Sequence, residues 1–484
     1  MGGFPCTPSA MAQEMQDARL HRWETPMHQT RGSLCPVPSR LSPALRYVKH
    51  VTLAGLLAPA LALAQTAPAG PALVAASSIN GADTAWLMIS TALVLLMTLP
   101  GIALFYGGMV RRFNVINTMA SVVGIAALVS VLWFALAYSL AFTPGGDFGA
   151  FIGGFDRIGF AGLEYLGSTG QVAVSHIAKA VPESVFAMFQ LTFAIITCAL
   201  VVGALVERMH FGALLLFSGL WLLLVYAPIA HWVWEPGGWL AQLGALDFAG
   251  GSVVHINAGA AALVCAYALG PRAGYGREPF VPFNLGLTMA GTGLLWVGWF
   301  GFNAGSALAA DGRAGLAMAV THIAAAAGAL SWMGAEWLAR KRASLLGLCS
   351  GVVAGLVAIT PAAGFVTPRS ALIIGLVAGV ACYWGATALK RKLRADDSLD
   401  VFGVHGVGGL VGALLTGLLA DPAISGVEAS FTAQVIACVA VLAYSLVMTA
   451  VVLWITSRFT TLRVREFEER AGLDVSLHNE QLGH

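Results

Sequence analysis

Two histidines stand inside apolar segments of this chain, and an aspartate precedes each of them. Asp247 lies eight residues before His255, and Asp400 lies five residues before His405. An ionisable side chain at membrane depth is costly, so it usually faces a bundle interior or a water-filled cavity and has a functional role. We expect each histidine to lie near the middle of a helix that starts at the aspartate.

The two histidines are 150 residues apart. A polar device that recurs in two halves of a membrane protein indicates an internal repeat, with the substrate site at the repeat interface. We therefore predict that both histidines lie at one shared site. The alternative for either histidine alone is a packed polar side chain that is hydrogen-bonded to a neighbouring carbonyl group. The matching pair favours the shared site.

The composition indicates an integral membrane protein. Hydrophobic residues make up 58% of the chain and charged residues 10%, whereas soluble domains contain about 25% charged residues. We predict an all-α fold that spans a lipid bilayer several times. The net charge of +2 does not favour binding to nucleic acid. No cluster with the spacing of metal ligands accompanies the histidines, so we predict no metal site, no cofactor and no enzymatic activity.

The N-terminal segment differs from the rest of the chain. Residues 1–45 are polar and lack helical periodicity, whereas residues 46–64 combine a basic start, a short apolar run and the sequence Ala-Leu-Ala. The second pattern is typical of a bacterial signal peptide, and its apolar run is too short to span a bilayer. Residues 1–45 are an extension produced by a mis-set start codon or the long first part of the signal. We interpret residues 65–83 as an exported linker.

Apolar runs of about 20 residues, the length that spans a bilayer as a helix, recur through residues 84–457. We predict about eleven transmembrane helices in this membrane domain, at 85–108, 118–142, 183–205, 211–232, 251–270, 283–305, 315–335, 344–363, 370–389, 402–420 and 431–457. Two inverted repeats of five helices plus one extra helix account for this number. His255 then lies on the fifth helix and His405 on the tenth, which are corresponding positions.

The loops between these segments differ in positive charge. Four basic residues fall on one side, namely Arg157, Lys179, Arg313 and Arg369. The other side carries most of the basic residues, including Arg340, Lys341, Arg342, Lys390, Arg391 and Lys392. Because basic loops stay in the cytoplasm, we expect the N-terminus outside and the C-terminus, with residues 458–484 as a tail, in the cytoplasm.

Aromatic residues form a second group of candidates. Phe189 and Phe193 are four residues apart, which places them on one face of a helix. Trp234 lies at the predicted outer boundary, where aromatic residues are ordinarily membrane anchors. Core packing is the corresponding alternative for the two phenylalanines.

Four segments together resemble the signatures of the Amt/Mep/Rh ammonium transporter family, at residues 100–108, 245–257, 298–306 and 400–406. They occur in the order and with the spacing of that family, and the resemblance extends from about residue 80 to the C-terminus. Trp234 is typical of the Amt branch. The resemblance implies a homotrimer in the inner (plasma) membrane of a bacterium, with one pore inside each subunit.

The resemblance also implies a role for each candidate residue. An outer site would bind the substrate ammonium, and its residues would be Trp234, Ser306, Phe189 and the supporting Asp247. The ring pair Phe193 and Phe302 would form a gate. The pore beyond it would be lined by His255, His405, Trp299 and Thr360. Asp247 also fits the N-cap of the helix that follows it.

These residue types suit the separation of ammonium from potassium. A tryptophan face attracts either cation, but only ammonium can donate a hydrogen bond to the Ser306 hydroxyl. An apolar pore is costly for an ion, so we expect ammonium to be deprotonated and to cross as ammonia. Methylammonium is the expected analogue, and potassium has no proton to leave behind.

The tail suggests regulation. Residues 472–480 resemble the Amt cytoplasmic tail and diverge from it after His478. The resemblance implies that a PII-type signalling protein docks on the basic cytoplasmic face, although the same charges also fix the topology. An ammonium sensor or transceptor acting with such a protein is the alternative function. Sensors of this kind usually carry a signalling domain, whereas 27 residues follow the last predicted helix.

Overall fold

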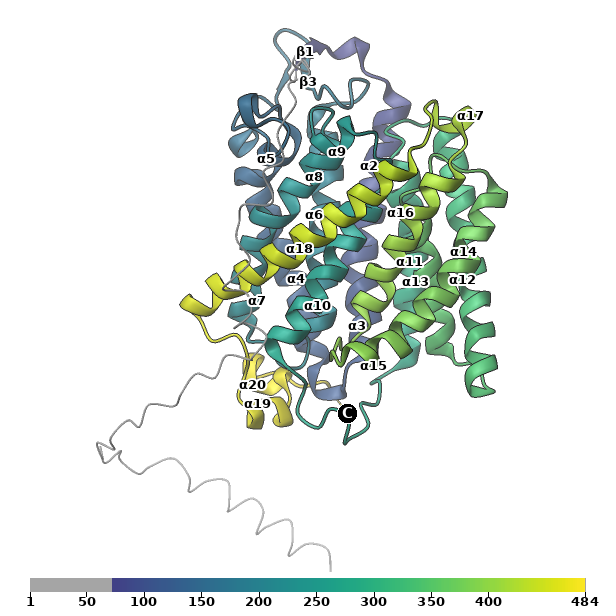
Figure 1. Cartoon of the computed structure of the whole chain (residues 1–484). Coiled ribbons are helices and arrows are strands. Elements are labelled where there is room, and N and C mark those ends of the chain that lie inside the picture. The colour runs from purple at the N-terminus through teal and green to yellow at the C-terminus, as the bar shows by residue number, and fades with distance from the viewer. Residues whose placement is uncertain (1–71, 484) are drawn as a thin grey trace, which may run out of the picture. The chain divides into compact units, whose positions relative to one another are not determined.

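The computed structural model describes residues 72–483, which form a bundle of long helices (Figure 1). The predicted extension 1–45 and signal peptide 46–64 lie outside the described residues. Ten helices in the described range are long and apolar enough to span a membrane: Gly81–Met109, Arg112–Phe142, Glu183–Leu205, Phe211–Gln242, Gly251–Leu269, Leu285–Gly305, Gly312–Arg340, Pro368–Leu393, Phe402–Leu419 and Phe431–Phe459. The prediction of a multi-pass helical membrane protein is therefore confirmed.

The eleventh predicted segment is a shorter apolar helix, α13 (Leu345–Ile359). Its predicted range was 344–363, but a turn replaces the helix from Thr360 to Phe365. Pro361 has no N–H group with which to continue the helix, which accounts for the early end. The first helix begins four residues before its predicted start, at Gly81, where the Asn80 side chain accepts hydrogen bonds from the N–H groups of Ala82 and Asp83.

Several spans consist of more than one helical piece. The helical pieces of the spans in the first half, divided or not, are α2 (Gly81–Leu96), η4 (Met97–Ile102), α3 (Ala103–Met109), α4 (Val115–Leu132), η6 (Trp133–Ala137), α5 (Tyr138–Phe142), α6 (Glu183–Leu205), α7 (Phe211–Trp221), η9 (Leu222–Tyr226), α8 (Ala227–Trp234), α9 (Trp239–Gln242), η10 (Gly251–Ile256) and α10 (Asn257–Leu269). The helical pieces of the spans in the second half are α11 (Leu285–Gly305), α12 (Gly312–Arg340), α14 (Pro368–Trp384), η11 (Gly385–Leu389), α15 (Lys390–Leu393), η12 (Phe402–Gly406), α16 (Val407–Leu419) and α18 (Phe431–Phe459).

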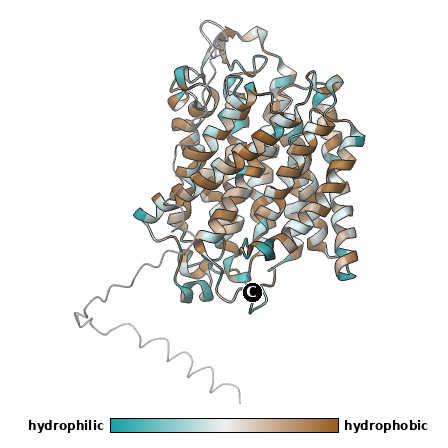
Figure 2. Ribbon diagram, viewed as in Figure 1, coloured by the Kyte–Doolittle hydropathy of each residue, from teal (hydrophilic) through white to brown (hydrophobic). Residues whose placement is uncertain are grey.

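The last span differs from the others in direction. Helix α18 runs obliquely across the bundle in Figure 1 and contacts α7, α10 and α16. It therefore packs on both helices that carry the candidate histidines. Figure 2 shows hydrophobic residues along the spans and hydrophilic residues gathered toward the ends of the helices.

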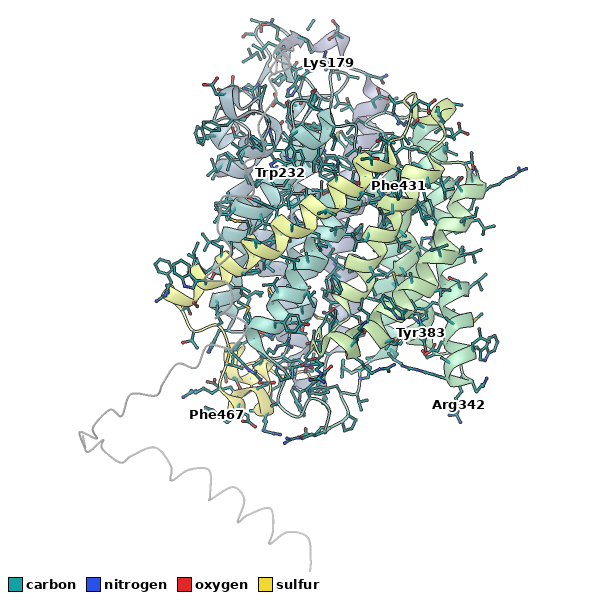
Figure 3. All side chains as sticks on the ribbon, viewed as in Figure 1. Lys179, Trp232, Arg342, Tyr383, Phe431 and Phe467 are labelled. Atoms are coloured by element: carbon teal, nitrogen blue, oxygen red, sulfur yellow. The ribbon has the colours of Figure 1, made fainter. Side chains whose placement is uncertain are left out.

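Small elements cover one end of the bundle. Strands β1 (Ala72–Ala75), β2 (Tyr165–Leu166) and β3 (Gln171–Val174) form an antiparallel sheet in the order β1-β3-β2. The described part of the predicted linker 65–83 thus contains a strand and the start of α2. Lys179 lies at this end in Figure 3, whereas Arg342 and Phe467 lie at the opposite end. The predicted outer and inner charges are therefore separated along the bundle.

Candidate functional site

The two histidine-bearing helices meet at glycines. A side chain at Gly259 of α10 would come within 2.4 Å of the backbone of Gly406 in η12, so only glycine allows this close approach. Nδ1 of His255 lies 3.3 Å from Nδ1 of His405. The sequence pattern predicted one shared site, and the structure brings the two rings into hydrogen-bond distance.

The expected mid-helix position of the histidines is wrong. His255 is the fifth residue of the helix that begins at Gly251, and His405 is the fourth residue of η12. The first of these helices cannot begin earlier, because Gly250 has a φ of +108° and so lies outside the helical region. Both histidines thus sit on π-helical turns at the starts of their helices.

Asp247 holds the start of the first histidine helix. Its Oδ1 accepts hydrogen bonds from the N–H groups of Gly250 and Gly251, and its Oδ2 accepts from Ser252 and Val253, at 2.6 to 3.2 Å. Each carboxylate oxygen therefore satisfies two of the N–H groups that a helix start leaves unpaired. The Asp247 carbonyl oxygen also accepts a hydrogen bond from Nε1 of Trp234 at 3.0 Å. One residue thus fixes both the helix start and the tryptophan.

The counterpart of Asp247 in the second half is Asp397 and not Asp400. Asp397 lies eight residues before His405, which is the spacing of the first motif, and its Oδ2 accepts the N–H of Phe402 at 2.7 Å. Burial raises the pKa of Asp397 to about 6. Asp400 instead pairs with Lys390 at 2.7 Å. The equal spacing was the signal that could have identified Asp397 from the sequence.

The candidate gate residues form a compact aromatic group. The rings of Phe193 and Phe302 stack with centroids 4.2 Å apart, and Phe189 lies 5.0 Å from Phe193. Trp234 meets the edge of Phe193 at 5.6 Å. Phe193 and Phe302 are buried, so a solute that passes between them must displace at least one ring. The predicted shared face of Phe189 and Phe193 is what allows this grouping.

Ser306 directly follows α11, whose last residue is Gly305. A side chain on the neighbouring Gly305 would come within 2.9 Å of the Phe189 ring. The Ser306 hydroxyl donates to the carbonyl oxygen of Phe302 at 2.9 Å. Its proton is thereby occupied, and the lone pairs of the oxygen remain able to accept a hydrogen bond from a donor such as ammonium.

Two further predicted residues, Trp299 and Thr360, contact each other, and Trp299 also packs against Phe302 at 5.3 Å. Nε1 of Trp299 donates to Oγ1 of Thr360 at 2.9 Å, and the Thr360 hydroxyl donates to the Leu356 carbonyl oxygen. The Trp299 ring stacks against His255 at 5.5 Å. Nε2 of His255 is buried and has no hydrogen-bond partner among the described residues. A buried polar atom of this kind normally finds a partner, so Nε2 marks a place for a small polar solute.

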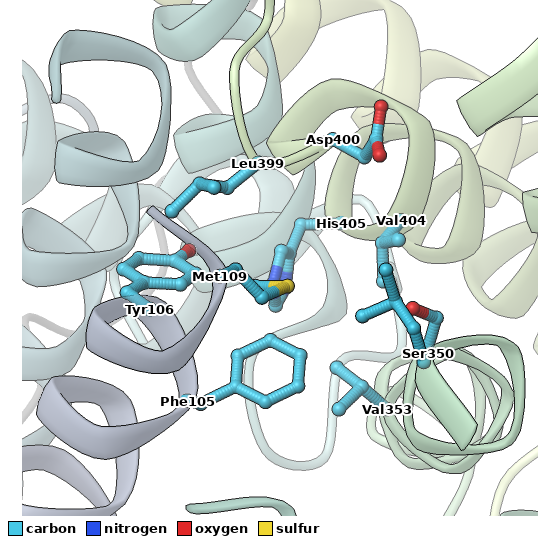
Figure 4. Close-up of a pocket in the computed structure, with 10 residues that line it drawn as sticks. Phe105, Tyr106, Met109, Ser350, Val353, Leu399, Asp400, Val404 and His405 are labelled. Carbon is cyan, nitrogen blue, oxygen red and sulfur yellow. The ribbon is translucent and has the colours of Figure 1, made fainter. Parts of the chain in front are cut away.

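A cavity of about 40 Å³ opens beyond His405 (Figure 4). One water-sized molecule needs roughly 10–15 Å³, so the cavity accommodates a small solute. Its lining comprises His405 together with Phe105, Tyr106, Met109, Leu346, Ser350, Val353, Leu399, Asp400 and Val404. Apart from His405, these residues were not among the site residues predicted from the sequence. Most of them are apolar helix positions, which do not reveal that they face a cavity, and Asp400 was expected only to start the helix of His405.

The tail is packed against the end of the bundle opposite the small sheet (Figure 1). Helices α19 (Glu466–Ala471) and α20 (Leu473–His478) follow α18. Oδ1 of Asp474 accepts the N–H of Asn117 at 2.8 Å, and Nε2 of His478 lies 3.0 Å from Oδ1 of Asn117. Glu469 binds Arg463 at 2.7 Å. The tail therefore contacts the start of α4 through specific polar groups.

Fold and site together define a multi-pass helical membrane protein with a polar histidine pair buried in its bundle. Residues 85–482 match the model of the Ammonium Transporter Family, and the chain belongs to this family. It is 46% identical over 408 residues to an ammonium transporter of Bacillus subtilis, covering 82% of this chain and 98% of that protein. The resemblance found in the sequence is therefore confirmed.

Solved structures are similar as well. The crystal structure of Candida albicans Mep2 matches with a TM-score of 0.74 and 36% identity, covering 81% of this chain and 88% of that chain. A structure described as a sensor Amt protein matches with a TM-score of 0.74 and 28% identity, covering 82% of this chain and 98% of that chain. Both similarities extend over most of the membrane bundle.

Proposed function

We propose that this protein transports ammonium through a path inside its own bundle. The observation that carries the proposal is the unbroken series of contacts from Trp234 through Phe193 and Phe302 to His255 and His405. The cavity lined by His405 continues the series (Figure 4). In this proposal the bundle consists of two inverted repeats plus α18, and three copies form a trimer in a bacterial plasma membrane.

Ammonium first binds at the outer end of this path. The Trp234 face attracts the cation, and the Ser306 oxygen accepts one of its hydrogen bonds. Potassium has a similar size and charge but donates no hydrogen bond. The serine therefore gives the outer site a preference for ammonium over potassium, which the tryptophan alone does not provide.

Beyond the stacked phenylalanines the path becomes apolar. Moving an unpaired ion into such surroundings costs several kcal/mol or more. The ammonium ion therefore transfers its proton to water at the outer end of the path, and ammonia crosses. The histidine pair provides both hydrogen-bond donors and acceptors for ammonia. Because the two Nδ1 atoms lie 3.3 Å apart, one of them donates and the other accepts, which the neutral rings achieve without charge repulsion.

The direct test uses the full chain in proteoliposomes, with uptake and electrical current recorded together. We expect ammonium-dependent uptake, weaker uptake of methylammonium and no potassium flux. An electrical current that depends on the ammonium concentration would show that the separated proton also crosses the membrane. Potassium flux comparable to that of ammonium, or no ammonium-dependent uptake at all, would contradict the proposal.

Replacement of Trp234 tests the outer site. The change Trp234→Leu removes a cation–π contact worth about 0.5–2 kcal/mol, so the half-saturating ammonium concentration should rise by up to roughly thirty-fold. Trp384→Leu is the matched control, because Trp384 lies on α14 and is exposed. An unchanged half-saturating concentration in the Trp234 variant would leave this residue only a role as an interfacial anchor.

Regulation by the tail is a second test. We propose that a PII-type protein docks on the basic inner face and on the tail, so a pull-down with the full chain should retain that protein at low 2-oxoglutarate. Deletion of 466–484 should abolish binding and lower uptake while the oligomer stays intact, because the contacts of Glu469 and Asp474 are lost. Deletion of 481–484 alone keeps α19 and α20 and should bind normally. If the PII-type protein does not bind the full chain, the proposal that it regulates transport is wrong.

The similarity to a protein described as a sensor favours a second candidate function, ammonium sensing. A sensor binds ammonium at the same outer site without carrying substantial flux. The proteoliposome measurement separates the two functions, because a sensor would give ligand binding without uptake.

A further inference from the structure

A group of buried ionisable side chains lies behind Trp234, outside the path described above. Glu235 follows Trp234 directly, at the end of α8, and is completely buried. Its Oε2 lies 2.9 Å from Nε2 of His176, which belongs to the loop between β3 and α6. His176 is also buried, with 4% of its side chain exposed. The two residues are 59 positions apart in the sequence.

The carboxylate of Glu235 depends on this histidine. Its second oxygen, Oε1, is buried without a hydrogen-bond partner in the described part of the chain, and so is Nδ1 of His176. A buried carboxylate costs several kcal/mol unless an opposite charge compensates it. The nearby cation Arg157 is already bound in two places to Glu183. Among the described residues, Nε2 of His176 is therefore the hydrogen-bond partner of the Glu235 carboxylate.

The other ionisable groups packed around the pair have partners of their own. The Tyr138 hydroxyl of α5 donates to Glu183 at 2.9 Å. His231, one helical turn before Glu235, places its two ring nitrogens 3.1 and 2.8 Å from the carbonyl oxygens of Ala141 and Gly149. No hydrogen bond joins the His231 side chain to the side chain of Glu235 or of His176.

The pair joins the two segments that build the outer site. Glu235 is covalently next to Trp234, whereas His176 lies in the loop that leads into α6, the helix that carries Phe193. Trp234 meets Phe193 edge to face, at an interplanar angle of 90°. A bond between Glu235 and His176 therefore fixes the tryptophan face relative to the phenylalanine gate.

We propose that His176 and Glu235 are positioning residues for Trp234, and that the charge of His176 sets the affinity of the outer site for ammonium. This inference rests on the proposed transport function. The ion pair exists only while His176 carries its proton. An imidazolium loses its charge as the pH rises, so the ion pair is lost in that direction. Loss of the pair loosens Trp234 and weakens cation binding.

The test is the half-saturating concentration for uptake by the full chain in proteoliposomes, measured at several pH values and expressed as the concentration of the ammonium ion itself. In the unmodified protein this concentration should rise roughly three- to tenfold as the pH increases, a part of the full Trp234 contribution. The maximal rate reports the later steps and need not follow this rise. A half-saturating concentration that does not change with pH in the unmodified protein overturns the inference without any variant.

Two variants test whether the pH dependence of the half-saturating concentration comes from His176 and Glu235. His176→Gln keeps a hydrogen-bond donor that does not titrate, so its half-saturating concentration should be independent of pH. Glu235→Gln removes the charge that the imidazolium compensates and should flatten the profile as well. His322→Gln is the matched control, since His322 is an exposed histidine of α12, and its profile should equal that of the unmodified protein.

The outcomes separate this inference from the proposed function. Variant profiles parallel to that of the unmodified protein, with normal ammonium uptake, would overturn the role of the pair and leave transport intact. Absence of ammonium uptake by the unmodified protein at every pH would instead overturn the transport proposal. If one variant fails to fold, the other variant and the unmodified protein still decide the question.

Discussion

The double variant His255→Ala, His405→Ala is expected to lose selective ammonium transport. In the proposed path the two rings supply polar atoms beyond the stacked pair Phe193 and Phe302, and Nε2 of His255 has no partner in the described chain. Loss of a hydrogen-bond partner for a buried solute costs about 1–3 kcal/mol, which corresponds to at least roughly fivefold slower passage. The two alanines also leave space in which water can carry ions, so we expect potassium flux to appear.

Uptake and current in proteoliposomes measure both effects at once. His322→Ala serves as the control for removal of an imidazole, because this histidine is exposed on α12. If the double variant carries an unchanged ammonium flux and still excludes potassium, the histidine pair has no part in conduction. Single variants would then be uninformative, and the path would have to be sought elsewhere in the bundle.

The change Asp247→Asn is expected to damage both the stability of the protein and its affinity for ammonium. Each oxygen of Asp247 accepts two backbone N–H groups, and an asparagine amide replaces one oxygen by a donor that faces two other donors. Unsatisfied buried groups cost about 1–3 kcal/mol each. The helix start and the Trp234 contact should loosen together.

Thermal unfolding of the solubilised protein and the half-saturating ammonium concentration check this expectation. We expect earlier unfolding, and weaker binding by up to roughly the thirty-fold effect of losing the Trp234 contact. Asp421→Asn is the matched control. The Asp421 side chain accepts one N–H group, that of Ala423, at an exposed position, where asparagine caps a helix equally well. Equal behaviour of the two variants would contradict the double role of Asp247.

Much of this arrangement could be predicted from the sequence, because its physical causes are local. Long apolar runs predicted the spans, and the shared residue types around His255 and His405 predicted that the two would meet. The spacing of Phe189 and Phe193 placed their rings on one helix face. In each case the pattern repeats over a few residues and needs no knowledge of distant contacts.

The features that the sequence did not predict depend on packing between distant segments. The apolar run predicted a span over 251–270, which agrees with the helix Gly251–Leu269. The expectation that this helix starts at Asp247 was wrong, because Asp247 holds the turn that precedes the helix. The inner cavity takes Tyr106 and Ser350 from helices that no spacing rule connects. His176 and Glu235 carry no pattern either, since only the fold brings the loop before α6 to the end of α8.

The direct contact between the two Nδ1 atoms has a kinetic consequence. A proton taken up at Nε2 of His255 and released from Nε2 of His405 moves the shared hydrogen from one Nδ1 to the other. The pair then has the opposite tautomers and cannot relay a second proton in the same direction until they reverse. After each proton, a relay of this kind stays inactive until both tautomers have reversed. If protons follow this route, the current at saturating ammonium is limited by that recovery and slows in heavy water.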